Sequence, residues 1–265
     1  MSAVVRTAMI GELIRDWRQR RRLSQLDLAV EAEVSTRHLS FVETGRAKPS
    51  REFVLHLAEY LEVPLRERNH LLLAAGFAPI YTETTLEDDA MGPVREAIDR
   101  LLTGHEPYPA LIVDGRWNLV SANRPMAAML QGVSPELLRP PANALRIALH
   151  PDGLAPRIVN FDSYSAHLMG RLRRRLAASA DAELLALRDE LRQYPHVSQG
   201  RTSSPDPAEM LYSPLVVRFA GADLTFFSII ATFGTALDVT LAELSIEAFY
   251  PSDPATTAAV RAAWG

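Results

Sequence analysis

Cysteine is absent from the 265-residue chain, and this absence excludes disulfide bonds, thiolate metal sites and cysteine nucleophiles. Long apolar runs are also missing: the most apolar stretch, residues 224–233, has the length of a strand and not of a membrane span. The first residues, MSAVVRTAMIGEL, lack the apolar core and small-residue cleavage site of a secretory signal. We therefore expect a cytoplasmic protein that does not associate with membranes.

The common catalytic and cofactor-binding motifs are missing as well. The sequence has no HExxH pair, no G-x-S-x-G turn, no P-loop and no glycine-rich dinucleotide turn. The seven histidines have no carboxylates at metal-binding spacings, and a lone histidine such as His167 on an apolar helix is usually hydrogen-bonded rather than a haem ligand. We expect no catalytic residues, no metal site and no cofactor.

The charges are unevenly distributed along the chain. The net charge is −4, but residues 1–51 contain ten basic and six acidic residues, so this segment stands at +4. The remainder contains 18 basic and 26 acidic residues and stands at −8. Because the local field decides whether phosphate binds, a basic N-terminal segment is compatible with nucleic-acid binding.

The first 77 residues have apolar side chains at helical spacing, interrupted by capping residues. Ser24, Ser35 and Ser50 each precede such a segment, where a serine hydroxyl can accept a hydrogen bond from a free N–H group. Pro64 begins a further segment and Gly76 ends it. The pattern predicts an all-α domain of five helices over residues 1–77.

The rest of the chain predicts a second domain of a different class. Residues 78–92 are polar and acidic and are expected to form a linker, followed by a domain over residues 93–265. A helix is expected first, then two strands joined by an Asp-Gly turn, a largely helical stretch, and three closing strands. The expected strands are residues 110–113, 117–122, 215–219, 224–232 and 242–249. This order predicts an α+β domain with one antiparallel five-stranded sheet and helices on one side.

The N-terminal domain contains the spacing of a helix-turn-helix motif. Ser24-Gln25-x-x-Leu28-Ala29 begins its first helix, and Val34-Ser35-x-x-x-Leu39-Ser40-x-x-Glu43-x-Gly45 forms the turn and the second helix. Over residues 9–77 the sequence resembles the XRE (Cro and lambda repressor) family of DNA-binding proteins. It departs from that family at Arg22 and Glu33, where glycine is usual and a left-handed backbone is favoured.

In such a motif, the N-terminal residues of the second helix reach base edges in the major groove. Arg37 can pair with guanine, Thr36 or Phe41 can contact a thymine methyl group, and Arg46 and Lys48 are expected on phosphates. The alternative for Arg46 and Lys48 is that they belong to an ordinary basic surface loop that does not contact DNA. The expected DNA-binding residues are Gln25, Ser35, Thr36, Arg37, His38, Ser40, Phe41, Arg46 and Lys48.

The second domain carries another resemblance. Its landmarks are Tyr108-Pro109-Ala110-Leu111, Trp117-Asn118-Leu119-Val120-x-Ala122-Asn123, Asn143-x-Leu145-Arg146 and His150-Pro151-Asp152-Gly153. These residues resemble the ligand-binding domain of MmyB-like transcription regulators, which implies a PAS-like fold and a small lipophilic ligand such as a fatty acid. Tyr164 stands where many relatives have tryptophan, which suggests a differently shaped pocket wall.

Six residues are the candidates for a ligand pocket, with an apolar body and a few polar anchors. They are Asn123, Met126, Asn143, Arg146, Arg157 and Leu168. Four of them have a structural alternative: Asn123 can cap a helix, Arg146 and Arg157 can pair with Asp152 or Asp162, and Met126 can fill the core together with Met129.

A run of arginines at positions 171, 173, 174 and 175 is typical of the solvated face of an amphipathic helix, with a phosphate or partner contact as the alternative. Taken together, these patterns predict a homodimeric, sequence-specific transcription regulator that binds double-stranded operator DNA and senses a small lipophilic ligand. The alternative is a DNA-tethered protein-interaction module without a small-molecule ligand.

Overall fold

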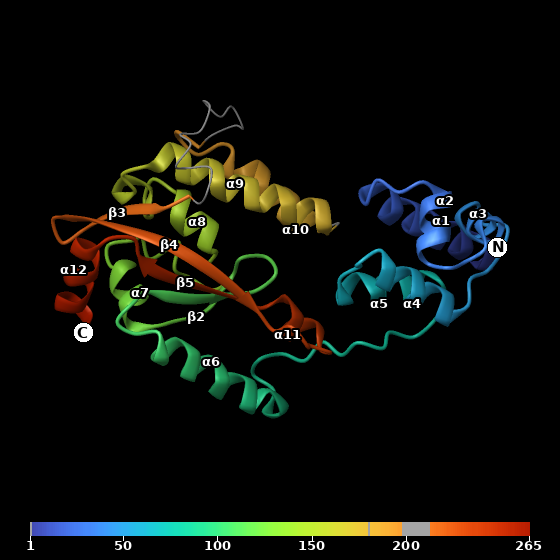
Figure 1. Ribbon diagram of the computed structural model, residues 1–265, viewed down its shortest axis with the longest axis horizontal. Coiled ribbons are helices and arrows are strands. Elements are labelled where there is room, and N and C mark those ends of the chain that lie inside the picture. The colour runs from blue at the N-terminus through green and yellow to red at the C-terminus, as the bar shows by residue number, and fades with distance from the viewer. Residues whose placement is uncertain (1, 180, 198–212) are drawn as a thin grey trace. The chain divides into compact units, whose positions relative to one another are not determined.

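The computed structural model describes residues 2–179, 181–197 and 213–265 (Figure 1). The chain divides into two compact units, and the division falls between Glu83 and Thr84, inside the segment 78–92 that was expected as a linker. The first unit also includes short pieces around residues 177–179 and 236–239. Each unit has its own hydrophobic core and is described separately.

The N-terminal unit is built from five helices, as the sequence predicts. They are α1 (Ser2–Arg20), α2 (Gln25–Glu31), α3 (Thr36–Glu43), α4 (Arg51–Tyr60) and α5 (Leu65–Ala74). The predicted N-caps are confirmed, since the side chains of Ser24, Ser35 and Ser50 each accept a hydrogen bond from a backbone N–H in the first turn. The helices share one core, which includes Ile10, Ile14, Trp17, Leu28, Leu39, Val42, Leu57 and Leu72.

The backbone turns between these helices with positive φ angles. Arg22 has a φ of 59° and Glu33 a φ of 51°, which confirms that both occupy the left-handed region where glycine was expected. Gly45, which ends α3, has a φ of 72°. Glu62, between α4 and α5, has a φ of 47°, and the sequence pattern did not anticipate this third strained position.

The C-terminal unit contains a five-stranded antiparallel sheet, which confirms the predicted α+β architecture (Figure 1). Its strand order is β2-β1-β5-β4-β3. The strands are β1 (Ala110–Val113), β2 (Leu119–Ala122), β3 (Leu215–Phe219), β4 (Ala222–Thr232) and β5 (Ser245–Pro251). The last strand therefore lies in the middle of the sheet, between the first strand and the β3–β4 hairpin.

Helices and two 3-10 turns surround this sheet. They are η1 (Asp89–Met91), α6 (Gly92–Gly104), α7 (Arg124–Met129), α8 (Ala144–Leu149), η2 (Ala155–Arg157), α9 (Phe161–Ala178), α10 (Ala182–Leu191), α11 (Val239–Glu243) and α12 (Pro254–Trp264). Helices α7, α8 and α9 pack on the sheet face that carries Leu111, Glu247 and Phe249. Helix α6 packs Ile98 and Leu102 on the opposite face, so the expectation of helices on one side only is wrong (Figure 1).

Three strands differ from their predicted bounds. The fourth strand begins at Ala222 instead of residue 224, and the last ends at Pro251 instead of residue 249. The second strand was expected from residue 117, but Trp117 has a φ of 63° and belongs to the turn, so β2 begins at Leu119. Asp114 holds this turn by accepting hydrogen bonds from the backbone N–H groups of Arg116 and Asn118. The last strand was expected from residue 242, but residues 239–243 form α11 and β5 begins at Ser245.

Candidate DNA interface and ligand pocket

Helices α2 and α3 form the two arms of the helix-turn-helix, and the start of α3 is open to solvent. The Ser35 hydroxyl accepts a hydrogen bond from the N–H of His38 at 3.3 Å, which fixes the first turn of α3. Ser35, Thr36 and Arg37 are exposed there. This arrangement leaves the N-terminal end of α3 accessible to the edge of a base pair.

All nine residues expected to contact DNA lie at the surface of the N-terminal unit. Arg46 and Lys48 are exposed in the loop after α3, and Gln25, His38, Ser40 and Phe41 are half-buried. The guanidinium carbon of Arg37 lies 5.3 Å from the centre of the Phe41 ring, and the His38 ring packs edge-on against Phe53 at 4.7 Å. The aromatic contacts orient Arg37 and His38 on the exposed side of α3.

Glu43 is a buried anchor of the recognition helix α3, and the sequence analysis gave it no such role. The Nε and Nη2 atoms of Arg18 donate to its two carboxylate oxygens at 2.7 and 2.8 Å, and Nε2 of Gln25 donates to Oε2 at 2.8 Å. Burial alone would raise the pKa of Glu43, but these hydrogen bonds outweigh burial and hold the pKa below its ordinary value. One carboxylate thus ties α3 to α1 and α2.

Gln25 is one of the residues expected to contact DNA, but its side chain is used inside the domain. Its side-chain amide is directed at Glu43 and not outward, so it orients the motif from inside. Its backbone N–H remains at the first position of α2, where a phosphate could accept from it. Glu43 itself could have been noticed from the sequence, because it follows Leu39 and Val42 on the buried side of α3.

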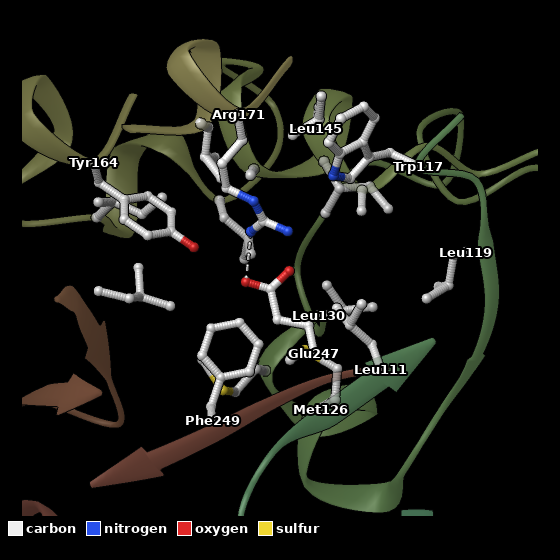
Figure 2. Close-up of a pocket in the computed structure, with 18 residues that line it drawn as sticks. Leu111, Trp117, Leu119, Met126, Leu130, Leu145, Tyr164, Arg171, Glu247 and Phe249 are labelled. Carbon is white, nitrogen blue, oxygen red and sulfur yellow. Dashed lines mark hydrogen bonds and ion pairs between the residues drawn. The ribbon is translucent and has the colours of Figure 1, made fainter. Parts of the chain in front are cut away.

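The C-terminal unit encloses a cavity between the sheet and helices α7, α8 and α9 (Figure 2). Its volume is about 70 Å³. The lining is largely apolar and comprises Leu111, Trp117, Leu119, Met126, Met129, Leu130, Ala144, Leu145, Ile147, Ala148, Leu154, Ile158, Tyr164, Leu168, Arg171, Leu215, Glu247 and Phe249. Ligand pockets usually measure roughly 300–1,000 Å³, so this cavity is smaller than a typical ligand pocket.

Three polar side chains interrupt the apolar lining. Nη1 of Arg171, from α9, donates to Oε1 of Glu247, from β5, at 2.9 Å, and the two side chains are 12% and 10% exposed. Tyr164 lies one helical turn before Leu168 and directs its hydroxyl into the same space (Figure 2). Burial raises the pKa of Tyr164, the nearby Glu247 carboxylate raises it further, and the phenol is therefore neutral.

Two of the six predicted ligand residues line this cavity, and two others cap helices. Met126 and Leu168 are among the lining residues. Asn123 caps α7 through Oδ1 and donates from Nδ2 to the carbonyl oxygen of Tyr108 at 2.8 Å. Asn143 caps α8 and donates to the carbonyl oxygen of Arg116 at 2.8 Å. The structure brings neither asparagine into the cavity, because both amides are used to shape the loops around it.

The two predicted arginine anchors also lie outside the cavity lining. Arg146 forms a two-pronged ion pair with Glu190 of α10 at 2.8 and 2.7 Å, and not with the aspartates that were considered as partners. Arg157 donates to the carbonyl oxygens of Met129 and Gln131 at 2.7 and 3.1 Å, which satisfies the C-terminal end of α7. Both arginines therefore hold the helices that cover the cavity.

Sequence reasoning missed Arg171 and Glu247, although each carries a local signal. The arginine run at 171–175 predicts a solvated side chain for Arg171, but Arg171 lies between the buried Leu168 and Leu172 of α9. Glu247 alternates with Phe249 on the covered face of β5. In both cases a charged residue occupies a position where the helical or strand periodicity predicts a buried apolar side chain, and this pattern could have identified both residues.

The described residues contain neither a cluster of metal ligands nor a helix that could span a membrane. No group of three or more potential metal ligands occurs in residues 2–179, 181–197 and 213–265. Over the same described part of the chain, no helix has the length and apolar character of a membrane span.

Comparison with known proteins agrees with this two-part organisation. Residues 94–263 match the family described as the MmyB-like transcription regulator ligand binding domain, and residues 10–71 match a family described as a helix-turn-helix domain. No curated protein matches the chain.

Among solved structures, the crystal structure of the clp gene regulator ClgR from Corynebacterium glutamicum matches at 23% identity and a TM-score of 0.24. The match covers 39% of this chain and 95% of that one, and a TM-score this low does not establish a shared overall fold. Because the first family match covers well over half of the sequence, the chain belongs to the MmyB-like transcription regulators and carries an N-terminal helix-turn-helix domain.

Proposed function

We propose that this regulator binds operator DNA sequence-specifically and that its C-terminal domain senses a small lipophilic ligand. The observation that carries the proposal is the cavity of the ligand-binding domain, which is apolar on nearly all sides and lies beneath three helices. An apolar ligand would gain from leaving water for such a lining. The contacts of Asn123, Asn143, Arg146 and Arg157 support a role in shaping the cavity walls.

For the DNA interface, we propose that Arg37 reads a base and that Arg46 and Lys48 contact phosphates. Their exposure beside the open end of α3 supports this assignment. In mobility-shift assays with an operator selected from random DNA, Arg37→Ala should relax the preference at one base pair, while Arg46→Ala should weaken binding to all sequences alike. Uniform loss of affinity in both variants would refute the assignment of Arg37.

We further propose that the regulator acts as a homodimer in the cytoplasm. A helix-turn-helix protein commonly binds two half-sites related by a two-fold axis, and a symmetric dimer matches that arrangement. Sedimentation velocity of the full-length protein, with and without its selected operator, measures this directly. A monomer that binds a single half-site would contradict the proposal.

Native mass spectrometry tests the sensing proposal. Purified protein is compared before and after extraction with organic solvent, and a lipid-sized mass difference is the expected result. Operator affinity is then measured with and without the extracted molecule, because a ligand shifts an equilibrium only by binding its two states unequally. Equal affinities would refute sensing, and the absence of any bound mass in cell-derived protein would favour the protein-interaction alternative.

A further inference from the structure

An ion pair lies in the lining of the cavity of the C-terminal unit. Arg171 and Glu247 come from α9 and β5, 76 positions apart in sequence, and meet in an otherwise apolar lining (Figure 2). Their charges cancel, so the cavity offers no net positive charge to an anion. A cavity with Arg171 alone would favour a carboxylate, and Glu247 removes that preference.

The pair keeps unused hydrogen-bonding capacity. Its hydrogen bond joins one guanidinium nitrogen to one carboxylate oxygen, Oε1 of Glu247. Within the described residues, neither the remaining N–H groups of Arg171 nor Oε2 of Glu247 have another protein partner. A donor and an acceptor are thus available side by side in the cavity, with the neutral Tyr164 hydroxyl pointing toward them (Figure 2).

We propose, on the basis of the sensing function proposed above, that the cavity takes a lipophilic ligand with an uncharged head group that both donates and accepts hydrogen bonds. A primary amide or an alcohol has this chemistry. Its N–H or O–H donates to Glu247 and its oxygen accepts from Arg171. Glu247 is the specificity-determining residue, because an ionised carboxylate would lie against a second carboxylate in a poorly hydrated space.

The proposal separates this chain from the fatty-acid ligand that the family resemblance suggests. The apolar lining suits an acyl chain of either compound, so the acyl chain does not discriminate between them. The head group discriminates between them, because dodecanamide and dodecanoate have nearly the same shape but differ in charge. This matched pair of probes isolates the effect of Glu247.

The experiment is a calorimetric titration of the full-length protein with dodecanamide and with dodecanoate, below the concentration at which either forms aggregates. The wild type should bind the amide at least about tenfold more tightly. In Glu247→Gln the order should reverse, because Arg171 then keeps an uncompensated positive charge. The control is Glu136→Gln, whose ion pair with Arg139 is solvent-exposed and lies outside the cavity lining, and it should keep the wild-type order.

A reciprocal variant keeps the test decisive if Glu247→Gln does not fold. Arg171→Gln leaves Glu247 uncompensated and should make dodecylammonium the preferred probe. Equal or tighter binding of dodecanoate by the wild type would overturn the head-group proposal while leaving the sensing function intact. No binding of either probe by the wild type would also overturn the head-group proposal, whereas the sensing proposal fails on the mass-spectrometry and operator-affinity measurements described above. An unchanged order in a folded Glu247→Gln variant would overturn the role of Glu247.

Discussion

Replacement of Glu43 by glutamine tests how the recognition helix is anchored. The Glu43 side chain is fully buried, and it accepts two hydrogen bonds from Arg18 and one from Gln25. Glutamine has the same length but no charge, and its NH₂ group would face the donors of Arg18. The guanidinium of Arg18, which is 10% exposed, would therefore remain buried without a counter-ion.

The size of the effect follows from this geometry. Removing one partner of a buried, hydrogen-bonded ion pair costs about 3–5 kcal/mol, because the remaining charge loses its compensation. Since the amide oxygen of glutamine can still accept one hydrogen bond, we expect the lower end, about 3 kcal/mol. For a domain of this size, that corresponds to a fall in melting temperature of roughly 12–24 °C.

Amide hydrogen exchange on the full-length protein measures the change locally, because it reports opening free energies for α1 and α3 separately from the C-terminal domain. The control is Glu62→Gln. Glu62 is 82% exposed and lies 3.8 Å from Arg21, so its removal should change stability by less than about 0.5 kcal/mol. If both variants exchange alike, Glu43 does not anchor the motif and the reasoning fails.

Three further outcomes are expected. Burial favours a raised pKa for Glu43, but its hydrogen bonds hold that pKa below the ordinary value. The stability that Glu43 contributes is therefore complete above its unfolded-state pKa and is lost as the pH falls through its folded-state pKa. Acid unfolding of the first domain, followed by circular dichroism, should show this loss only when Glu43 is present. Glu33→Gly should raise thermal stability by about 0.5 kcal/mol, because glycine relieves the strain of a positive φ but loses more entropy on folding; a lower melting temperature would contradict this. Arg157→Ala should cost about 1–2 kcal/mol in urea unfolding, since two carbonyl oxygens lose a donor, with no change in the order of amide and carboxylate binding.

Local sequence signals predict most of the fold because they arise from backbone chemistry. A serine before a helical period caps the helix whatever the tertiary context, as Ser24 and Ser35 do. Short apolar runs next to turn signals predict strands such as β1 and β3 in the same way. The start of β2 could not be predicted, because the positive φ of Trp117 depends on a turn held by Asp114 and carries no local pattern.

The polar centre of the cavity depends on tertiary pairing, and this explains why the arginine anchors were misassigned. Arg146 and Arg157 look like free cations in sequence, but their partners are Glu190 and two backbone carbonyl oxygens contributed by distant segments. Arg171 looks solvated beside exposed Arg173 and Arg174, and only its pairing with Glu247 shows that it faces inward. Helical spacing reduces the number of arginines that could face the core, but tertiary packing decides which of them is buried.

The small size of the cavity bears on how sensing would produce a response. A volume of about 70 Å³ holds two or three water molecules, and an extended acyl chain needs several times more. If the domain takes a lipophilic ligand, we expect the ligand to displace apolar side chains of α7, α8 or α9 while the Arg171–Glu247 pair stays at the head-group end of the cavity. That displacement gives the ligand unequal affinity for two arrangements of the domain, which is the condition for a population shift. A ligand that fitted the cavity without moving its walls would bind but would change nothing at the operator.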